Sequence, residues 1–211
     1  MELADIFLKL QATGCHNLNL VTPTHFLHPI IDALSMAREK GFKLPVVYNT
    51  SGYERTETLD ILDGIVDIYL ADIRYAADDA ARKFSCAPGY ALIARNAVKA
   101  MHEQAGGLVI EDGIAKKGLI IRLLILPNGL SGLEETFEFL SKKVSKDVFI
   151  SLMSQYLPAY KAPGIKEISR RITKKEYDTA VELLHEYGFS NGWVQGFVSD
   201  DSLAGTNLKP I

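Results

Sequence analysis

The alternation of apolar and polar positions predicts a chain in which helices and strands take turns. Apolar side chains recur at spacings of three and four, which predicts helices at residues 3–10, 26–40, 57–62, 78–102 (around a break at Pro88 and Gly89), 133–144 and 174–187. Short apolar runs closed by polar or turn-forming residues predict strands at 17–21, 44–48, 65–70, 119–126 and 148–153, with a hairpin at 108–113.

The predicted strands are apolar on both faces and are joined by short connections, as in a parallel sheet that is covered by helices. An open doubly wound sheet and a complete or partial (β/α) barrel both have this pattern. We expect one α/β domain over residues 1–190. Residues 191–211 contain Gly192, Gly196, Gly205 and Pro210 and are expected to form a loosely structured tail.

The first predicted helix reaches back to Leu3, with no N-cap residue before it. In a fold whose repeat is strand then helix, this start leads us to expect that a first strand is lacking. A barrel without that strand has an open edge, so we also expect self-association through the edge strand.

The composition of the chain argues against several classes of function. The chain has 211 residues, is 47% hydrophobic and carries a formal net charge of −3 without a basic run, which argues against nucleic-acid binding. Its longest apolar stretch is broken by Arg122 and falls short of the roughly 18 residues of a membrane span. Cys15 and Cys86 match no zinc or disulfide pattern, and no export signal precedes them, so we expect a cytoplasmic protein.

Polar residues follow the carboxyl ends of several predicted strands. Thr22, Asn49, Asp72 and Gln155 each stand just past such an end. Parallel sheets and barrels both bind ligands at this edge, so these residues are candidates for a site. The loop from Asn49 through Ser51 to Gly52 suits a ribose or an amino-acid group, although such residues also form ordinary turns.

Arg122 is the most informative charge, because it interrupts a strand that should be apolar on both faces. Its guanidinium must be satisfied by an anion, which leaves ligand binding and a structural salt bridge to a group such as Asp72 open. Asp72 and Arg74 alternate on a strand end, so they face either a ligand or each other. His25 and His28 share a helix face but have no third metal ligand nearby, and no phosphate-binding glycine loop occurs.

These strand ends, in this order, resemble the radical S-adenosylmethionine enzymes of the pyruvate formate-lyase-activating type, and above all their uncharacterised activating-enzyme-like iron–sulfur subgroup. The resemblance rests on residues 17–26, 46–53, 70–74, 121–127 and 152–156 and covers roughly residues 3–190. Asn49 and Ser51 replace the Asp and Asn of the family's Asp-Thr-Asn-Gly tip, and Arg74 replaces a lysine.

The resemblance implies a partial, TIM-like (β/α) barrel of the radical S-adenosylmethionine type. It implies that Thr22, Pro23, Thr24 and His25 lie near the methionine amino end, that Asn49 and Ser51 contact the ribose or the carboxylate, and that Arg122 contacts the carboxylate; Asp72, Arg74 and Gln155 complete the expected site. In the family a [4Fe–4S] cluster on a Cys-x3-Cys-x2-Cys loop cleaves S-adenosylmethionine reductively to a 5′-deoxyadenosyl radical. The implied partners are an electron donor and a glycyl-radical-type protein substrate.

The chain departs from the family in its cysteines. Cys15 and Cys86 do not form the cluster loop, so the chain cannot ligate a cluster by itself. We therefore expect a truncated or inactive form of an oxidoreductase. Two alternatives remain: a non-enzymatic or small-carboxylate-binding (β/α) barrel, and a lyase or aldolase that uses Asp72, Arg74 and Arg122.

Overall fold

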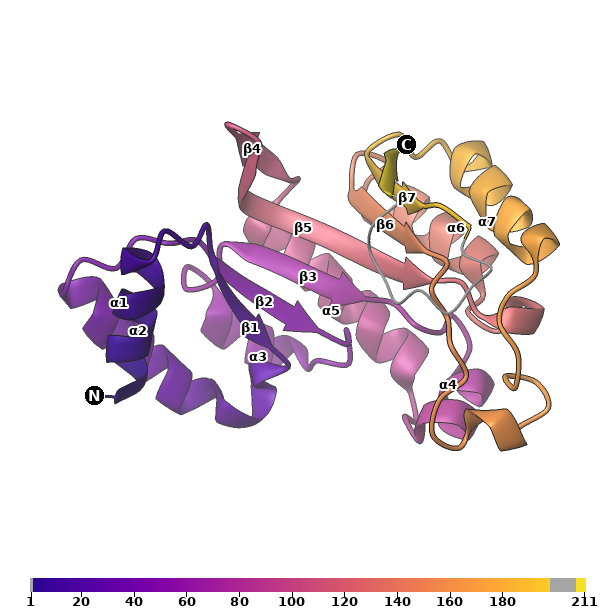
Figure 1. Ribbon diagram of the computed structural model, residues 1–211, viewed down its shortest axis with the longest axis horizontal. Helices are drawn as coiled ribbons and strands as arrows, with labels where there is room; N and C mark the ends of the chain where they lie inside the picture. Colours follow the sequence, from indigo (N-terminus) through magenta and orange to yellow (C-terminus); the bar gives the residue numbers. More distant parts are fainter. Residues whose placement is uncertain (1, 198–207) are drawn as a thin grey trace.

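The computed structural model describes residues 2–197 and 208–211. These residues form one eight-stranded sheet in the order β1-β2-β3-β5-β6-β7-β8, with β4 paired to β5 (Figure 1). The strands are β1 (Leu18–Val21), β2 (Val46–Thr50), β3 (Ile68–Asp72), β4 (Val109–Glu111), β5 (Ile114–Leu124), β6 (Phe149–Met153), β7 (Gly192–Gln195) and β8 (Leu208–Pro210).

Along the path β1-β2-β3-β5-β6-β7 neighbouring strands run parallel, because a helical segment returns the chain between them, whereas β4 pairs with β5 antiparallel. The helices are α1 (Glu2–Ala12), α2 (Leu27–Glu39), α3 (Thr56–Leu62), α4 (Asp78–Ser85), α5 (Tyr90–Ala105), α6 (Leu133–Lys143) and α7 (Lys174–Glu186), with short 3-10 turns at η1 (Pro23–Phe26), η2 (Pro127–Gly129) and η3 (Ala162–Gly164). None of the described helices is both long and apolar enough to cross a membrane. The expected open, partial (β/α) architecture is confirmed.

The two faces of the sheet differ in burial. Tyr48, Tyr69 and Leu123 point to the face that α5 covers and are fully buried. Leu70, Ile120, Leu124 and Met153 point to the opposite face and are only half-buried. Figure 1 shows α5 behind β3 and β5, with this second face toward the viewer. The sheet therefore presents a partly open face, as expected of a barrel that does not close.

The chain end differs from our expectation. Gly192–Gln195 continues the sheet next to β6, and Leu208–Pro210 pairs with it antiparallel. The loosely structured tail expected for 191–211 thus contributes two strands, although residues 198–207 lie outside the described part. The glycines of this segment indicated a loop, but Gly192 has a structural role in the strand. It has φ +132°, and a Cβ there would lie 1.9 Å from the Ile150 carbonyl oxygen, so only glycine allows β7 to pack this closely on β6.

The other edge of the sheet is β1. Within the described residues it pairs with β2, and its outer side has no strand partner. Val21, at the end of this strand, is 68% exposed. Self-association through this edge stays a prediction.

Candidate functional site

Arg122 joins three neighbouring strands at the carboxyl edge of the sheet. It stands opposite Asp72 in the β3–β5 register, so both side chains point to the partly open face. Its Nε donates to Asp72 Oδ1 at 2.6 Å, and its Nη2 donates to Asn49 Oδ1 at 2.9 Å. The predicted site residues on β2, β3 and β5 are therefore in direct contact, and the salt bridge that we left open as an alternative is present.

Asp72 lies between two guanidinium groups. Its second oxygen, Oδ2, accepts from Arg74 Nη2 at 3.2 Å. Asp72 is 13% exposed, whereas Arg122 is 28% and Arg74 52% exposed. Since one carboxylate balances only one of the two arginines, the cluster keeps an excess positive charge that faces solvent, which favours the carboxylate group of a ligand.

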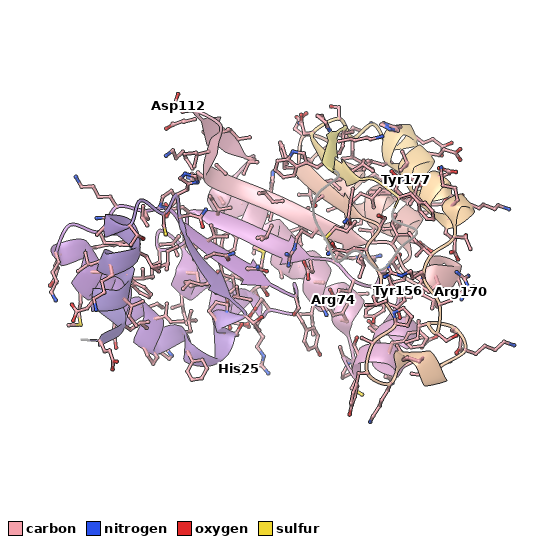
Figure 2. All side chains as sticks on the ribbon, in the orientation of Figure 1. His25, Arg74, Asp112, Tyr156, Arg170 and Tyr177 are labelled. Atoms are coloured by element: carbon pink, nitrogen blue, oxygen red, sulfur yellow. The ribbon has the colours of Figure 1, made fainter. Side chains whose placement is uncertain are left out.

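A cavity of about 350 Å³ opens beside this cluster. Its polar wall comes from Asp72, Arg74, Arg122 and Gln155, and its apolar wall is lined by Ile73, Tyr75, Leu124, Leu126, Met153 and Tyr156. Figure 2 shows Arg74 and Tyr156 close together where the strands end. The volume is within the roughly 300–1,000 Å³ of small-molecule sites, and the two walls suit a ligand that is charged at one end and flat or apolar at the other.

A second cavity, of about 390 Å³, lies between α6 and α7. Its polar lining includes Glu134, Glu135 and Glu176 against a single lysine, Lys175. This lining offers the carboxylate group of a ligand only Lys175 as a cationic partner, whereas the cavity beside Arg122 offers two arginines, so we assign the carboxylate-binding site to the latter.

Tyr90 of α5 connects the loops that follow β2 and β3. Its hydroxyl donates to the Ser51 carbonyl oxygen at 2.8 Å and accepts from the Arg74 amide at 2.9 Å. Burial raises the pKa of this phenol well above its ordinary value of about 10, so the hydroxyl stays protonated in mild alkali as well as near pH 7. Ser51 thus contacts Tyr90 through its backbone carbonyl and does not line the cavity beside Arg122, and sequence patterns do not reveal this contact.

The loop after β1 carries the other predicted site residues. Thr22 has φ +50°, and its amide donates to the Asn49 carbonyl oxygen at 2.8 Å, so the loop adjoins the Arg122 cluster. A left-handed conformation costs a β-branched residue about 1–2 kcal/mol, so this loop is strained. Pro23 is buried, while His25 is exposed and lies beyond the end of β1 in Figure 2.

Sequence reasoning missed Glu54, a buried carboxylate in the loop between β2 and α3. Its Oε1 accepts from Thr50 Oγ1 at 2.6 Å and from Thr24 Oγ1 at 2.7 Å. The available signal was an acidic residue four positions after a polar strand end, which resembles many residues in turns before helices.

The described residues do not suit an iron–sulfur cluster. Cys15 precedes β1 with its sulfur 3.5 Å from Thr13 Oγ1, whereas Cys86 ends α4 and is exposed. A cluster needs several converging thiolates, and no group of three or more His, Cys, Asp or Glu side chains that could hold a metal occurs among the described residues. His25 and His28 are exposed and form no such group.

Comparisons with known proteins support the fold. No family model matches the chain. A curated relative, an uncharacterized protein of Methanocaldococcus jannaschii, is 34% identical over 189 residues, which cover 88% of this chain and 51% of the relative. The chain therefore spans about half the length of that relative.

Among solved structures, a domain of pyruvate-formate lyase-activating enzyme from Bacteroides vulgatus is similar, with a TM-score of 0.60 and 17% identity. The match covers 85% of this chain and 99% of that domain. At this level of identity the likeness concerns the fold. The chain thus has the fold of an activating-enzyme domain, with a positively charged cavity at the carboxyl edge of its sheet.

Proposed function

We propose that this chain is the S-adenosylmethionine-binding part of a radical S-adenosylmethionine protein of the activating type. The observation that carries the proposal is the chain of contacts from Asn49 through Arg122 to Asp72 at the edge of the cavity. The activating-enzyme fold supports the same assignment.

The residues of the cavity suit the chemical groups of S-adenosylmethionine. Arg122 and Arg74 offer donors for its carboxylate, and Asp72 offers an acceptor for its ammonium group. Tyr75, Tyr156 and their apolar neighbours provide a surface for the adenine ring. When bound, S-adenosylmethionine would supply a carbon–sulfur bond for reductive cleavage.

The described residues hold that ligand in this proposal, and they carry out no redox step. The cluster that would deliver an electron does not fit Cys15 and Cys86, so we assign no cleavage to this chain. An electron donor and a glycyl-radical-type protein substrate are, by the same reasoning, proposed partners of a longer protein.

Cys15 and Cys86 form no metal-binding group within the described residues, which favours a second candidate: a protein with the same (β/α) fold that binds a small carboxylate. Here Arg122 and Arg74 bind a carboxylate without an adenosyl group, and the aromatic wall contributes little. The two candidates differ in the ligand, which makes them separable by a direct binding measurement.

The test is isothermal titration of the protein with S-adenosylmethionine, S-adenosylhomocysteine, methylthioadenosine and succinate. We expect the first two to bind, methylthioadenosine to bind more weakly because it lacks the carboxylate, and Arg122→Ala to lose about 10-fold or more in affinity. Arg82→Ala, an exposed arginine on α4, is the matched control and should bind like the wild type. Binding of succinate alone would support the second candidate, and binding of none would refute both.

A further inference from the structure

Glu54 is a buried carboxylate that faces hydroxyl groups. It is 4% exposed, and among the described residues its side chain forms no ion pair with a lysine, arginine or histidine. A buried carboxylate is stable only where hydrogen bonds replace its water shell. Thr50 and Thr24 donate to Oε1, and the Tyr48 hydroxyl lies 3.4 Å from the same atom.

These bonds connect two loops that are distant in sequence. Thr50 ends β2 and also accepts from the Gly52 amide at 3.2 Å, so it fixes the loop that carries Glu54. Thr24 belongs to η1, the turn after β1, and its hydroxyl lies 3.0 Å from the hydroxyl of Tyr48. The Glu54 side chain therefore links the turn after β1 to the end of β2. This link adds to the backbone hydrogen bond from the Thr22 amide to the Asn49 carbonyl oxygen.

The loop after β1 has few other hydrogen bonds: its backbone bonds Asn49 through the Thr22 amide, and the Thr24 hydroxyl also lies 3.0 Å from the hydroxyl of Tyr48. η1 begins at Thr22, whose backbone is in the left-handed region and whose side chain forms no cap hydrogen bond. His25 and Phe26 at the other end of the turn are exposed. Since a strained conformation persists only where its surroundings impose it, the bond from Thr24 to the buried Glu54 carboxylate is a contact that helps to keep the loop in place.

We propose that Glu54 is a positioning residue: its carboxylate holds residues 22–26 beside Asn49 at the edge of the Arg122 cavity, and so sets how tightly that cavity binds its ligand. The loop claim stands on the hydrogen bonds, and the ligand claim rests on the proposed function. Glu54 itself contacts the loop, and acts on the site through it.

The first test is hydrogen–deuterium exchange of the ligand-free protein, followed over residues 22–27. Glu54→Met removes the acceptor at similar size, whereas Glu54→Gln keeps a carbonyl oxygen at the same position. We expect exchange in this segment to become about 10-fold faster in Glu54→Met and to stay within about 3-fold of the wild type in Glu54→Gln. Glu57→Met, an exposed position on α3, is the control and should leave the segment unchanged.

A second variant covers the case in which Glu54→Met does not fold. Thr24→Val removes the hydroxyl from the loop side and leaves Glu54 its bond from Thr50. It should speed exchange of the same segment, and the double variant should exchange no faster than Glu54→Met alone. Wild-type exchange rates in folded Glu54→Met or in Thr24→Val would overturn the proposal, as would a Glu54→Gln variant as fast as Glu54→Met.

The ligand claim is tested by titration with S-adenosylmethionine. We expect about 10-fold weaker binding in Glu54→Met, with affinity largely restored in Glu54→Gln. If the wild type does not bind S-adenosylmethionine, the proposed function fails while the exchange result stands. If the wild type binds and folded Glu54→Met binds equally well, the role of Glu54 in the site fails while the proposed function stands.

Discussion

Arg122 is a charged residue in the middle of an apolar strand, and the structure shows how the fold accommodates it. Its guanidinium bonds side chains from β2 and β3 while 28% of it stays exposed at the cavity. Because a charge at an interior strand position must have a partner, its importance is predictable from sequence. The identity of its partners depends on the strand order, which places Asp72 directly opposite.

Glu54 and Tyr90 were not predictable in the same way. Both lie outside the strands, and each acts through a contact with a distant loop: Glu54 with Thr24, and Tyr90 with the backbone of Ser51 and Arg74. A single acidic or aromatic residue beside a helix has no sequence pattern that distinguishes it from a surface or core residue.

Tyr90→Phe should destabilise the protein by about 1–2 kcal/mol. The substitution keeps the ring, which stacks on Tyr53, and removes the hydroxyl between the Ser51 carbonyl and the Arg74 amide. Urea unfolding measures the effect. Tyr53→Phe is the control: it removes an exposed hydrogen bond to the Pro88 carbonyl oxygen and should cost less. Equal stability of Tyr90→Phe and the wild type would contradict the role given to the hydroxyl.

Gly52→Ala should be more damaging than an ordinary glycine substitution. Gly52 has φ +75°, and a Cβ there would lie 2.3 Å from the Asp72 carbonyl oxygen, so the loop after β2 must move away from β3. We expect a loss of about 2 kcal/mol or more in the free energy of unfolding. Gly64→Ala is the control, since it has a similar φ of +71° and open space around its Cβ position. Equal losses for the two variants would show that backbone conformation alone sets the cost.

At the scale of elements, the positions of most helices were predictable from the sequence, but the observed ends of several strands differ from the predicted ones. β2 spans Val46–Thr50 where we expected residues 44–48, so Asn49 and Thr50 belong to the strand and point to opposite faces. This shift decides their roles: Asn49 reaches Arg122, and Thr50 reaches Glu54. Apolar periodicity cannot place such ends, because polar residues that bond within the sheet resemble loop residues.

An ion-pair cluster anchors the long connection between β6 and α7. Arg170 in this connection donates from both Nη atoms to the Glu176 carboxylate, at 2.9 and 2.8 Å, and from Nη2 to Asn128 Oδ1 at 2.9 Å. Glu176 also accepts from the Thr173 amide in a capping box. The cluster thereby links η2, the connection and α7 beside the cavity between α6 and α7, which Glu176 lines.

This cluster predicts a loss of stability in acid. The hydrogen bond from Arg170 lowers the pKa of Glu176 to about 2. A carboxyl group with a lowered pKa stabilises the fold above its ordinary pKa, so this contribution is complete at neutral pH and is lost as the pH falls from about 5 toward 2. Allowing for solvent screening, we expect Glu176→Gln to lower the free energy of unfolding at pH 7 by about 1–2 kcal/mol and to flatten its dependence on pH in that range.

Denaturant unfolding between pH 2 and 7 measures this effect. Glu182→Gln, an exposed position on the same helix, is the control and should follow the wild type. A Glu176→Gln variant with the same acid dependence as the wild type would contradict the assignment.

At the scale of the whole molecule, three buried tyrosines join the sheet to the helices that cover it. Burial raises the pKa of Tyr48 to about 12 and raises that of Tyr69 and Tyr90 further. A group with a raised pKa favours the folded state below its ordinary pKa of about 10, and this contribution is lost as the pH rises above it, because the unfolded chain can ionise first. The protein should therefore unfold cooperatively in alkali.

Absorbance at the tyrosinate band and circular dichroism, recorded together during an alkaline titration, test this prediction. We expect part of the tyrosinate signal to appear only with the loss of secondary structure. Complete ionisation of all tyrosines with the fold intact would contradict the burial of these phenols.

The overall architecture could be predicted because the alternation of elements and the resemblance of the strand ends point to the same open (β/α) fold. The added strands β7 and β8 could not, since a four-residue and a three-residue strand rich in glycine and proline have no distinct apolar pattern.

The central claim is that the Arg122 cavity binds S-adenosylmethionine. A crystal structure of the protein grown with saturating S-adenosylmethionine tests it most directly. We expect the ligand's carboxylate within hydrogen-bond distance of the Arg122 guanidinium and its adenine against Tyr75 and Tyr156. A ligand bound elsewhere on the molecule, or an empty cavity at saturating concentration, would contradict it.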